Sequence, residues 1–209
     1  MLSPEQPFET KRRFVLAIAM HVETPRFLLR DFLEADRQSF IAYQLDPRYQ
    51  GLYDWHDADA GRATTLFDLF SVWRQQNPRQ NFQVGIFERT SSRLCGCAGL
   101  RQAGKPEATA VFGLELTPTD WGRYGVAIEV ACALIEYGFH ALRLHTITGD
   151  TASGNSRVEK LARWFGASIV DRRDGPAWMR ARGWEEVEWA LSRDAWKASP
   201  RRRRLLKTN

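Results

Sequence analysis

Two glycines just ahead of an apolar helical segment form the clearest candidate binding site in this sequence. Val111–Leu116 is apolar and aromatic apart from Glu115, which predicts a strand that ends at Pro118. Residues 122–125, Gly-Arg-Tyr-Gly, predict a short loop, and from Val126 apolar residues recur at helical spacing. A helix N-terminus has about four unpaired N–H groups and roughly half a positive charge, and glycines let an anion approach it. The alternative is a strand–turn–helix that binds no ligand.

The same loop carries a family resemblance. Residues 122–127, Gly-Arg-Tyr-Gly-Val-Ala, resemble the Arg/Gln-x-x-Gly-x-Gly/Ala signature of the GNAT family of N-acetyltransferases. The flanking Trp121 and Glu129 resemble its ribosomal-protein alanine acetyltransferase branch, although Gly122 replaces the usual Arg or Gln and Tyr124 is one extra residue. In the family these loop amides hold the pyrophosphate of coenzyme A. The resemblance therefore implies a pyrophosphate site formed by Arg123, Tyr124, Gly125, Val126 and Ala127.

The order of predicted elements extends this resemblance over residues 24–192. The opening strand, 24–30, resembles the Thr-Pro-Arg-Leu-x-Leu-Arg start of the same branch, and residues 155–167 resemble the Asn-x-x-Ser-x-x-x-x-Lys-x-Gly-Phe region of the family. Between and around them we expect helices at 34–45, 58–76, 126–139 and 155–165, and strands at 82–88, 93–100, 111–116, 144–148, 168–171 and 185–191. This is the family's layout. It implies an α/β (α+β) GNAT fold with a mixed, mostly antiparallel sheet of six to seven strands. The sheet would have a V-shaped splay between two central parallel strands and helices on both faces.

The family inserts the pantetheine arm of the cofactor between those two strands. Carried over here, the backbone of Glu115, Leu116 and Thr117 would pair with the arm, and an N–H among them would stabilise the thioester oxygen as it gains negative charge. Asn155 matches the asparagine that contacts the arm. The implied co-substrate is acetyl-CoA, and we expect no metal.

Acetyl transfer to an amine needs a neutral amine, whereas a lysine-like amine titrates at about 10.4. Glu115 is the candidate general base because it is the only carboxylate in the strand beside the expected thioester; the alternative is an outward-facing residue with a salt partner. Asp120 ranks lower because it would repel pyrophosphate, and His145, although it titrates in the right range, is more often a core residue at such a position. Ser156 is the candidate acid, because residues 155–166 lack the tyrosine that the family commonly uses; its alternative role is a helix cap.

Residues 46–57 form a predicted loop that is dense in aromatic residues and acids. Aromatic faces and carboxylates suit a cationic amine, so Tyr53, Trp55 and Asp57 are the candidate substrate-binding residues. Alternatively, Tyr49, Tyr53 and Trp55 only hold the loop against the core. The sequence therefore predicts an acetyl-CoA-dependent N-acetyltransferase that acts by direct attack in a ternary complex on a primary amine of a small molecule or a protein N-terminus. The alternative class is a non-catalytic coenzyme A-binding or interaction protein on the same fold.

Length and charge place these elements in one domain. A chain of 209 residues can bury a self-sufficient core. The formal net charge of +5 comes from Arg201–Arg204 and Lys207, so the body is near neutral and is no nucleic-acid platform. We expect a variable extension at 1–23, an acetyltransferase domain at 24–198 and a basic, disordered tail at 199–209; the alternative for the tail is an RNA-binding arm.

Cysteine usage and hydropathy suggest a cytoplasmic protein. Cys95, Cys97 and Cys132 form no disulfide framework, and Cys95-Gly-Cys97 lacks a second pair at zinc spacing, so we expect core thiols in a reducing compartment. No apolar run approaches the roughly 20 residues of a membrane-spanning helix. An edge strand near 185–191 could pair two copies into a homodimer.

Overall fold

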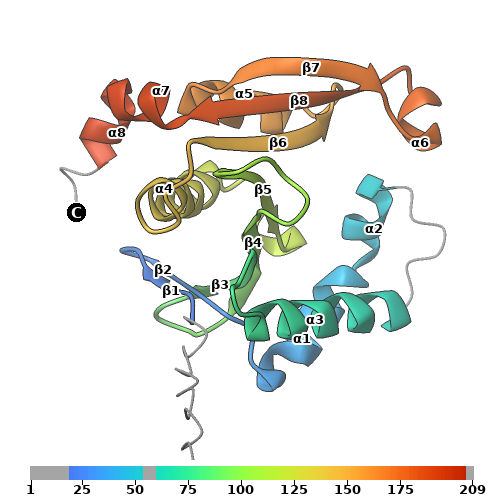
Figure 1. Cartoon of the computed structure of the whole chain (residues 1–209). Helices are drawn as coiled ribbons and strands as arrows, with labels where there is room; N and C mark the ends of the chain where they lie inside the picture. Colours follow the sequence, from blue (N-terminus) through green and yellow to red (C-terminus); the bar gives the residue numbers. More distant parts are fainter. Residues whose placement is uncertain (1–18, 54–59, 206–209) are drawn as a thin grey trace, which may run out of the picture.

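In the computed structural model of the chain, residues 19–53 and 60–205 are described, and one eight-stranded sheet runs through them (Figure 1). The strand order is β1-β2-β3-β4-β5-β6-β8-β7. All neighbouring strands pair antiparallel except β5 and β6, which are parallel. The strands are β1 (His21–Glu23), β2 (Phe27–Arg30), β3 (Asn81–Glu88), β4 (Leu94–Arg101), β5 (Thr109–Leu116), β6 (Thr146–Ala152), β7 (Ser168–Asp174) and β8 (Glu185–Ser192).

Helices cover both faces of this sheet, as predicted. The short η1 (Glu34–Asp36), α1 (Arg37–Gln44), α2 (Pro47–Tyr53) and α3 (Ala60–Gln75) lie on one face, which we call the α1–α3 face, and α4 (Tyr124–His140) and α5 (Ser156–Phe165) lie on the other. The connections contain η2 (Pro118–Asp120) and α6 (Ala177–Arg180), and α7 (Arg193–Ala198) and α8 (Pro200–Leu205) follow the last strand. None of the helices in the described part of the chain is both long and apolar enough to cross a membrane.

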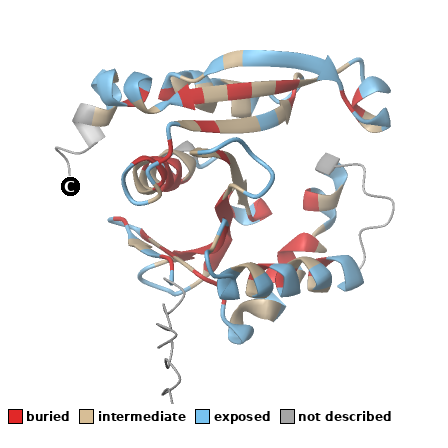
Figure 2. Ribbon diagram, in the orientation of Figure 1, coloured by how far each residue is buried: buried red, intermediate tan, exposed pale blue. Residues whose placement is uncertain are grey.

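Alternation along β4 divides the core into two clusters. Cys97 packs with aromatic residues of α1 and α3, including Phe40 and Phe67, whereas Ala98 and Leu100 pack with α4. Successive strand residues point to opposite faces, so a single strand contributes to both clusters. Figure 2 shows buried residues along the central strands and on α4.

The parallel strands β5 and β6 pair over only three residues of each strand. The paired residues are Thr109 with Thr146, Ala110 with Ile147 and Val111 with Thr148. β5 then continues to Leu116 along β4, and β6 continues to Ala152 along β8. Because each strand follows its antiparallel partner, the two strands diverge beyond Val111. The predicted V-shaped splay is confirmed.

The sheet has more strands than predicted because its first strand lies in the expected N-terminal extension. His21–Glu23 forms β1 on the edge beside β2. Just before it, Met20 is 1% exposed and its N–H donates to Asp31 Oδ2 at 2.9 Å. Residues 20–23 thus belong to the folded domain, and the boundary predicted at residue 23 is too late.

Two further expectations about the C-terminal part are wrong. The strand near 185–191 is β8, which lies between β6 and β7, so its two edges are already paired and β7 is the edge strand. The basic segment predicted to be disordered contains α8, and Arg202 in it binds Glu136 of α4 at 2.6 and 3.1 Å. Burial of apolar surface at Trp196, 1% exposed, holds this end of the chain to the core.

Candidate active site

The pairing of β5 with β4 determines which residues of β5 direct their backbone N–H and C=O groups into the splay. In antiparallel strands, residues that exchange hydrogen bonds alternate with residues that do not. Thr117 N–H donates to Cys95 O at 2.8 Å, so Thr117 is a residue that bonds toward β4. Because bonding and non-bonding residues alternate, Glu115, which is paired with Cys97, also bonds toward β4. Leu114 and Leu116 therefore direct their backbone groups toward the splay. Of the three residues predicted to face the cofactor arm, only Leu116 has its backbone groups directed away from β4 and toward the splay.

Leu116 and Thr117 differ further in what their polar groups contact. The indole Nε1 of Trp121 donates to Leu116 O at 2.9 Å, which leaves the N–H of Leu116 as the group aimed into the splay. Thr117 donates through its hydroxyl to Asp120 Oδ2 at 2.8 Å, in addition to its backbone bond with Cys95. Thr117 holds the loop together and offers no N–H to a ligand, so this part of the prediction is corrected.

The N-terminus of α4 lies at the end of the loop that follows β5. Gly122 adopts a φ of +79°, a conformation that favours glycine, and the backbone enters the helix at Tyr124. Arg123, the residue before the helix, makes no side-chain cap. Arg123 N–H donates to Asp120 O at 3.3 Å and Val126 N–H donates to Arg123 O at 2.9 Å, so the anion-binding character expected of this helix end rests on the amides of Tyr124 and Gly125. Val126 is 2% exposed and its N–H is bonded to Arg123 O, so it offers neither its side chain nor its N–H to such a site.

A buried carboxylate stabilises the loop just ahead of α4. Asp120 is 1% exposed and accepts bonds from Arg93 at 2.6 and 3.0 Å and from Arg123 at 3.2 Å. Burial opposes its charge, but the hydrogen bonds from Arg93 and Thr117 outweigh this and lower the pKa of Asp120. Its charge is therefore neutralised locally, and it is not placed to act as a base.

The opening segment of the domain anchors the first turns of α4. Glu129 Oε1 accepts from Thr24 Oγ1 at 2.7 Å and from Arg26 N–H at 2.9 Å, and Glu129 Oε2 accepts from Arg26 Nε at 2.7 Å. Arg26 also donates to Gly125 O at 2.9 Å. Burial again opposes the charge, and the hydrogen bonds from Thr24 and Arg26 prevail, so the pKa of Glu129 is lowered. The sequence contained both ends of this contact but gave no sign that they meet.

Glu115 is the centre of a hydrogen-bonded cluster on the α1–α3 face. Its carboxylate accepts from Tyr43 OH at 2.5 Å, Gln44 Nε2 at 2.8 Å, Cys97 Sγ at 3.1 Å and Tyr49 OH. Among the described residues no cation pairs with it, so the predicted alternative, an outward-facing residue with a salt partner, is wrong. Burial and the nearby Glu115 charge raise the pKa of Tyr43 and of Cys97 well above their usual values. Both therefore remain protonated donors.

The sequence did not identify Tyr43 or Gln44 as site residues. They end α1, more than seventy positions before Glu115, and each looks like an ordinary helix residue. Tyr49 is 2% exposed and packs against Tyr43 at 5.5 Å between ring centroids. Tyr49 therefore packs against the core, as the alternative expected, but its hydroxyl also binds Glu115. The part of the predicted loop that is described is largely helical, since Pro47–Tyr53 forms α2.

On the other side of the splay, β6 leads into α5. Asn155 caps this helix, since its Oδ1 accepts from Val158 N–H at 3.2 Å, and Ser156 is the exposed first helical residue. The cap therefore belongs to Asn155, whose amide NH₂ is left to donate elsewhere. His145 is exposed and precedes β6 at the end where β5 and β6 pair, away from the opening of the splay. It is not a core residue and takes no part in this site.

The predicted substrate-binding residues are not placed by the structure. Tyr53 ends α2, but its side chain lies outside the described residues, as do Trp55 and Asp57. The side chain of Tyr124 is likewise outside the description. Within residues 19–53 and 60–205, no three His, Cys, Asp or Glu side chains are grouped so that they could hold a metal ion.

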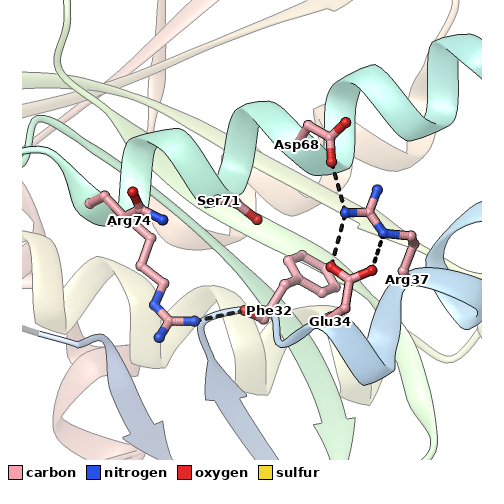
Figure 3. Close-up of a pocket in the computed structure, with 7 residues that line it drawn as sticks. Phe32, Glu34, Arg37, Asp68, Ser71 and Arg74 are labelled. Atoms are coloured by element: carbon pink, nitrogen blue, oxygen red, sulfur yellow. Dashed lines mark hydrogen bonds and ion pairs between the residues drawn. The ribbon is translucent and has the colours of Figure 1, made fainter.

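A cavity of about 490 Å³ lies away from these residues, between η1, the start of α1, and α3 (Figure 3). Arg37 bridges it, donating to Glu34 at 2.5 and 2.9 Å and pairing with Asp68 at 2.8 Å. None of the predicted site residues lines the cavity. Its ion pairs fasten α1 to α3 and so hold the helix that carries Tyr43 and Gln44.

Comparison with known proteins identifies the family. A family model described as an acetyltransferase (GNAT) domain matches residues 26–168, so the chain belongs to the GNAT family and is an acyltransferase. An uncharacterized N-acetyltransferase of Bacillus subtilis (strain 168), YoaA, is 28% identical over 143 residues, covering 67% of this chain and 78% of the relative.

Solved structures agree on the fold. A GNAT-family acetyltransferase from Bacillus anthracis superposes with a TM-score of 0.69 at 18% identity, covering 84% of this chain and 99% of that one. A Vibrio cholerae structure assigned as a ribosomal-protein-serine acetyltransferase gives 0.65 at 19% identity, covering 83% and 97%. At these identities the likeness establishes a shared fold. The predicted GNAT fold is confirmed.

Proposed function

We propose that this protein is an acetyl-CoA-dependent N-acetyltransferase acting on a primary amine. The observation that carries the proposal is the divergence of β5 and β6 beyond Val111 and Thr148, with the N–H of Leu116 directed into the gap. An extended amide-bearing chain such as pantetheine can pair with such a strand edge as an added strand would. The uncapped N-terminus of α4 supports the diphosphate end of the same ligand.

In this proposal the chain holds acetyl-CoA through backbone groups. The backbone of Leu114 pairs with the pantetheine arm, and the amides of Tyr124 and Gly125 at the start of α4 bind the pyrophosphate. Arg123 lies beside these amides with its side chain 58% exposed, so it can add charge to the phosphate contact. On the other side of the splay, the side-chain NH₂ of Asn155, which follows β6, donates to the pantetheine arm. Acetyl-CoA supplies the activated acetyl group, and the N–H of Leu116 stabilises the developing oxyanion.

Glu115 is the proposed proton acceptor on the α1–α3 face. Its carboxylate has about four lone-pair sites and already accepts four donors, so a proton reaches it most directly through one of their hydroxyl groups. Tyr49 and Tyr43 can each accept a proton on oxygen while passing their own to Glu115. Ser156, exposed on the first turn of α5, is the proposed donor to the leaving thiolate.

The acceptor is a small-molecule amine or a protein N-terminus. A protein N-terminus is supported by the resemblance of the loop to the ribosomal-protein alanine acetyltransferase branch. The Vibrio cholerae neighbour assigned as a ribosomal-protein-serine acetyltransferase supports it as well. Tyr53, Trp55 and Asp57 remain the proposed contacts to the acceptor. The three free, buried thiols fit a reducing compartment, which supports the cytoplasm as the location.

The test begins with calorimetry of the full chain with acetyl-CoA, which we expect to bind in the micromolar range. Thiol release should then be followed across a panel of amines and short peptides. Binding without thiol release from any acceptor would favour the non-catalytic alternative. Absence of binding at millimolar acetyl-CoA would contradict both readings.

Two substitutions test the proposed proton acceptor. Glu115→Gln keeps the shape of the cluster but removes the charge, and should lower kcat by about 10²-fold or more, the size expected of a general base. Tyr49→Phe removes one hydroxyl and should lower kcat less. Arg163→Gln changes an exposed residue of α5 and serves as a control. An unchanged kcat in Glu115→Gln, with folding intact, would remove Glu115 from the reaction.

A further inference from the structure

A row of polar side chains crosses the α1–α3 face of the sheet and connects two opposite charges. Arg101 Nη1 donates to Gln83 Oε1 at 3.3 Å, and Gln83 Nε2 donates to Cys97 Sγ at 3.1 Å. Cys97 Sγ donates in turn to Glu115 Oε1 at 3.1 Å. We call Arg101, Gln83, Cys97 and Glu115 the polar row. Nothing in the sequence had singled out Arg101 or Gln83.

A pair of glycines allows these side chains to lie flat on the sheet. Gly99 of β4 is the cross-strand partner of Gly113 of β5. A Cβ at Gly99 would lie 2.3 Å from Gln83 Oε1, and a Cβ at Gly113 would lie 3.2 Å from both Nη atoms of Arg101. The guanidinium of Arg101 therefore lies over β5, two residues before Glu115. At the usual rise of a strand this separation is about 7 Å.

Both charges in the polar row lack an ionic partner. Among the described residues, no carboxylate lies within ion-pair distance of Arg101, and its side chain donates only to Gln83. Glu115 is bound by neutral donors alone. Arg101 is partly exposed, so a ligand can reach it. A protein that leaves two opposite charges unneutralised on one face, close to a proposed reaction site, presents a surface suited to a ligand with both charges.

We propose that the amine acceptor also carries an anionic group, a carboxylate or a phosphate, and that Arg101 selects it. This inference rests on the proposed function, which places the amine near Glu115. The anion then lies toward the closed end of the splay, where the planar guanidinium can bind it through paired N–H groups.

A second polar group lies at that end. Thr148 of β6 pairs with Val111, which pairs with Arg101 on its other side, so all three share one face. The Thr148 hydroxyl is buried and has no hydrogen-bond partner among the described residues. Buried polar groups are normally satisfied, so this hydroxyl is a second polar group at that end for which the described residues provide no partner.

The test compares acids with their neutral counterparts. Glycine, β-alanine and 4-aminobutyrate are paired with their amides, and O-phosphoethanolamine with ethanolamine. Thiol release from acetyl-CoA gives kcat and KM for each, and calorimetry gives binding of the same compounds. We expect at least one acid to exceed its neutral counterpart by about tenfold or more in kcat/KM, since a hydrogen bond to a charged group contributes that much. The carboxylate and phosphate arms show which anion is preferred.

Arg101→Gln should reduce the ratio of kcat/KM for acid over neutral counterpart to near one, mainly by raising KM for the acids. Arg101→Lys should keep part of this preference. Arg172→Gln, which removes an exposed arginine on β7, is the charge-matched control and should keep the preference. Thermal unfolding of each variant confirms that it is folded.

Failure of this inference differs from failure of the proposed function. Equal kcat/KM for acids and neutral amines, or a preference that survives Arg101→Gln, would overturn the inference and leave acetyl transfer standing. Thiol release from no compound would contradict the proposed function for these amines. Calorimetry would then decide the inference, since Arg101-dependent binding of an acid supports it and equal binding of acid and amide rejects it.

Discussion

At the scale of single residues, the three cysteines show how burial controls a thiol in this sheet. Cys95 and Cys97 lie on opposite faces of β4, and Cys132 lies in α4. Burial raises the pKa of Cys95 to about 11 and that of Cys132 to about 11, and it raises the pKa of Cys97 well above the usual value. Because the thiolate is the reactive form, all three should be inert in the folded protein.

The first prediction follows from these shifts. Alkylation by iodoacetamide at pH 8 should be slow in the native protein and rapid for all three thiols after unfolding. The folded state favours the protonated thiol of Cys95 and of Cys132. The contribution of each buried thiol to stability is therefore complete below the ordinary pKa of about 9 and is lost as pH rises toward 11. The free energy of unfolding should fall over this window by at most about 1.4 kcal/mol per pH unit for each thiol.

Variants with one cysteine replaced by alanine provide the control. The Cys132→Ala variant should lose its share of the alkaline decline, and Cys97→Ala should disturb the Glu115 cluster as well. Rapid labelling of the native protein at pH 8 would show that the thiols are reached by solvent and would contradict this account of their burial.

At the scale of elements, α4 is positioned by a contact far along the chain. Glu129 accepts three hydrogen bonds from Thr24 and Arg26, and Arg26 also donates to Gly125 O in the first turn. The carboxylate thus joins the start of β2 to the helix end that is proposed to bind diphosphate. Its position sets the direction in which the first amides of α4 point.

The second prediction concerns Glu129→Gln. The neutral amide cannot accept all three bonds, so unfolding free energy should fall by about 1–3 kcal/mol. Affinity for coenzyme A should weaken several-fold, because the helix end is less firmly oriented. Calorimetry and urea unfolding measure the two effects. Glu159→Gln removes an exposed helical pair with Arg163 and should change stability by less than about 0.5 kcal/mol.

The elements also show what the sequence could and could not predict. Most helices and strands from 24 to 192 followed from local periodicity, including the strand at 93–100, which contains Gly96, whereas α2 and α6 were not predicted. The structure shows why glycine is needed at position 96: a Cβ there would lie 2.1 Å from Glu115 O on the next strand. Such a contact between strands cannot be seen in the local sequence. In the same way β1 has only three residues, too short for a periodic pattern, and depends on pairing with β2.

The candidate site was predicted only in its local part. The glycine loop, Leu116 and Asn155 were proposed because each lies within a short local motif, and their contacts to the cofactor stay predictions. The partners of Glu115 were missed because Tyr43, Gln44 and Tyr49 come from α1 and α2, distant in sequence. The interior place of β8 was missed for a related reason, since strand order depends on contacts across the whole chain.

At the scale of the whole molecule, the C-terminal segment folds back onto the helices that flank the splay. Trp196 Nε1 donates to Glu136 Oε1 at 2.8 Å, and Arg202 donates to both carboxylate oxygens of Glu136. Arg201 donates to Trp164 O of α5 and lies over the Trp164 ring at 5.0 Å. Because α4 and α5 begin at the two sides of the splay, this segment ties together the elements that would hold the cofactor.

The last prediction is that this segment stabilises the fold instead of binding nucleic acid. Arg202 and Glu136 are 19% and 18% exposed, so their bonds are partly shielded from water. Deleting 200–209 or substituting Arg202→Gln should therefore lower unfolding free energy by about 1–3 kcal/mol. Lys197→Gln, at an exposed position of α7, should leave it within about 0.5 kcal/mol. RNA association measured across salt concentration should be weak in the full chain. Strong salt-sensitive binding that the deletion abolishes, with stability unchanged, would reverse the assignment and make the segment an RNA-binding arm.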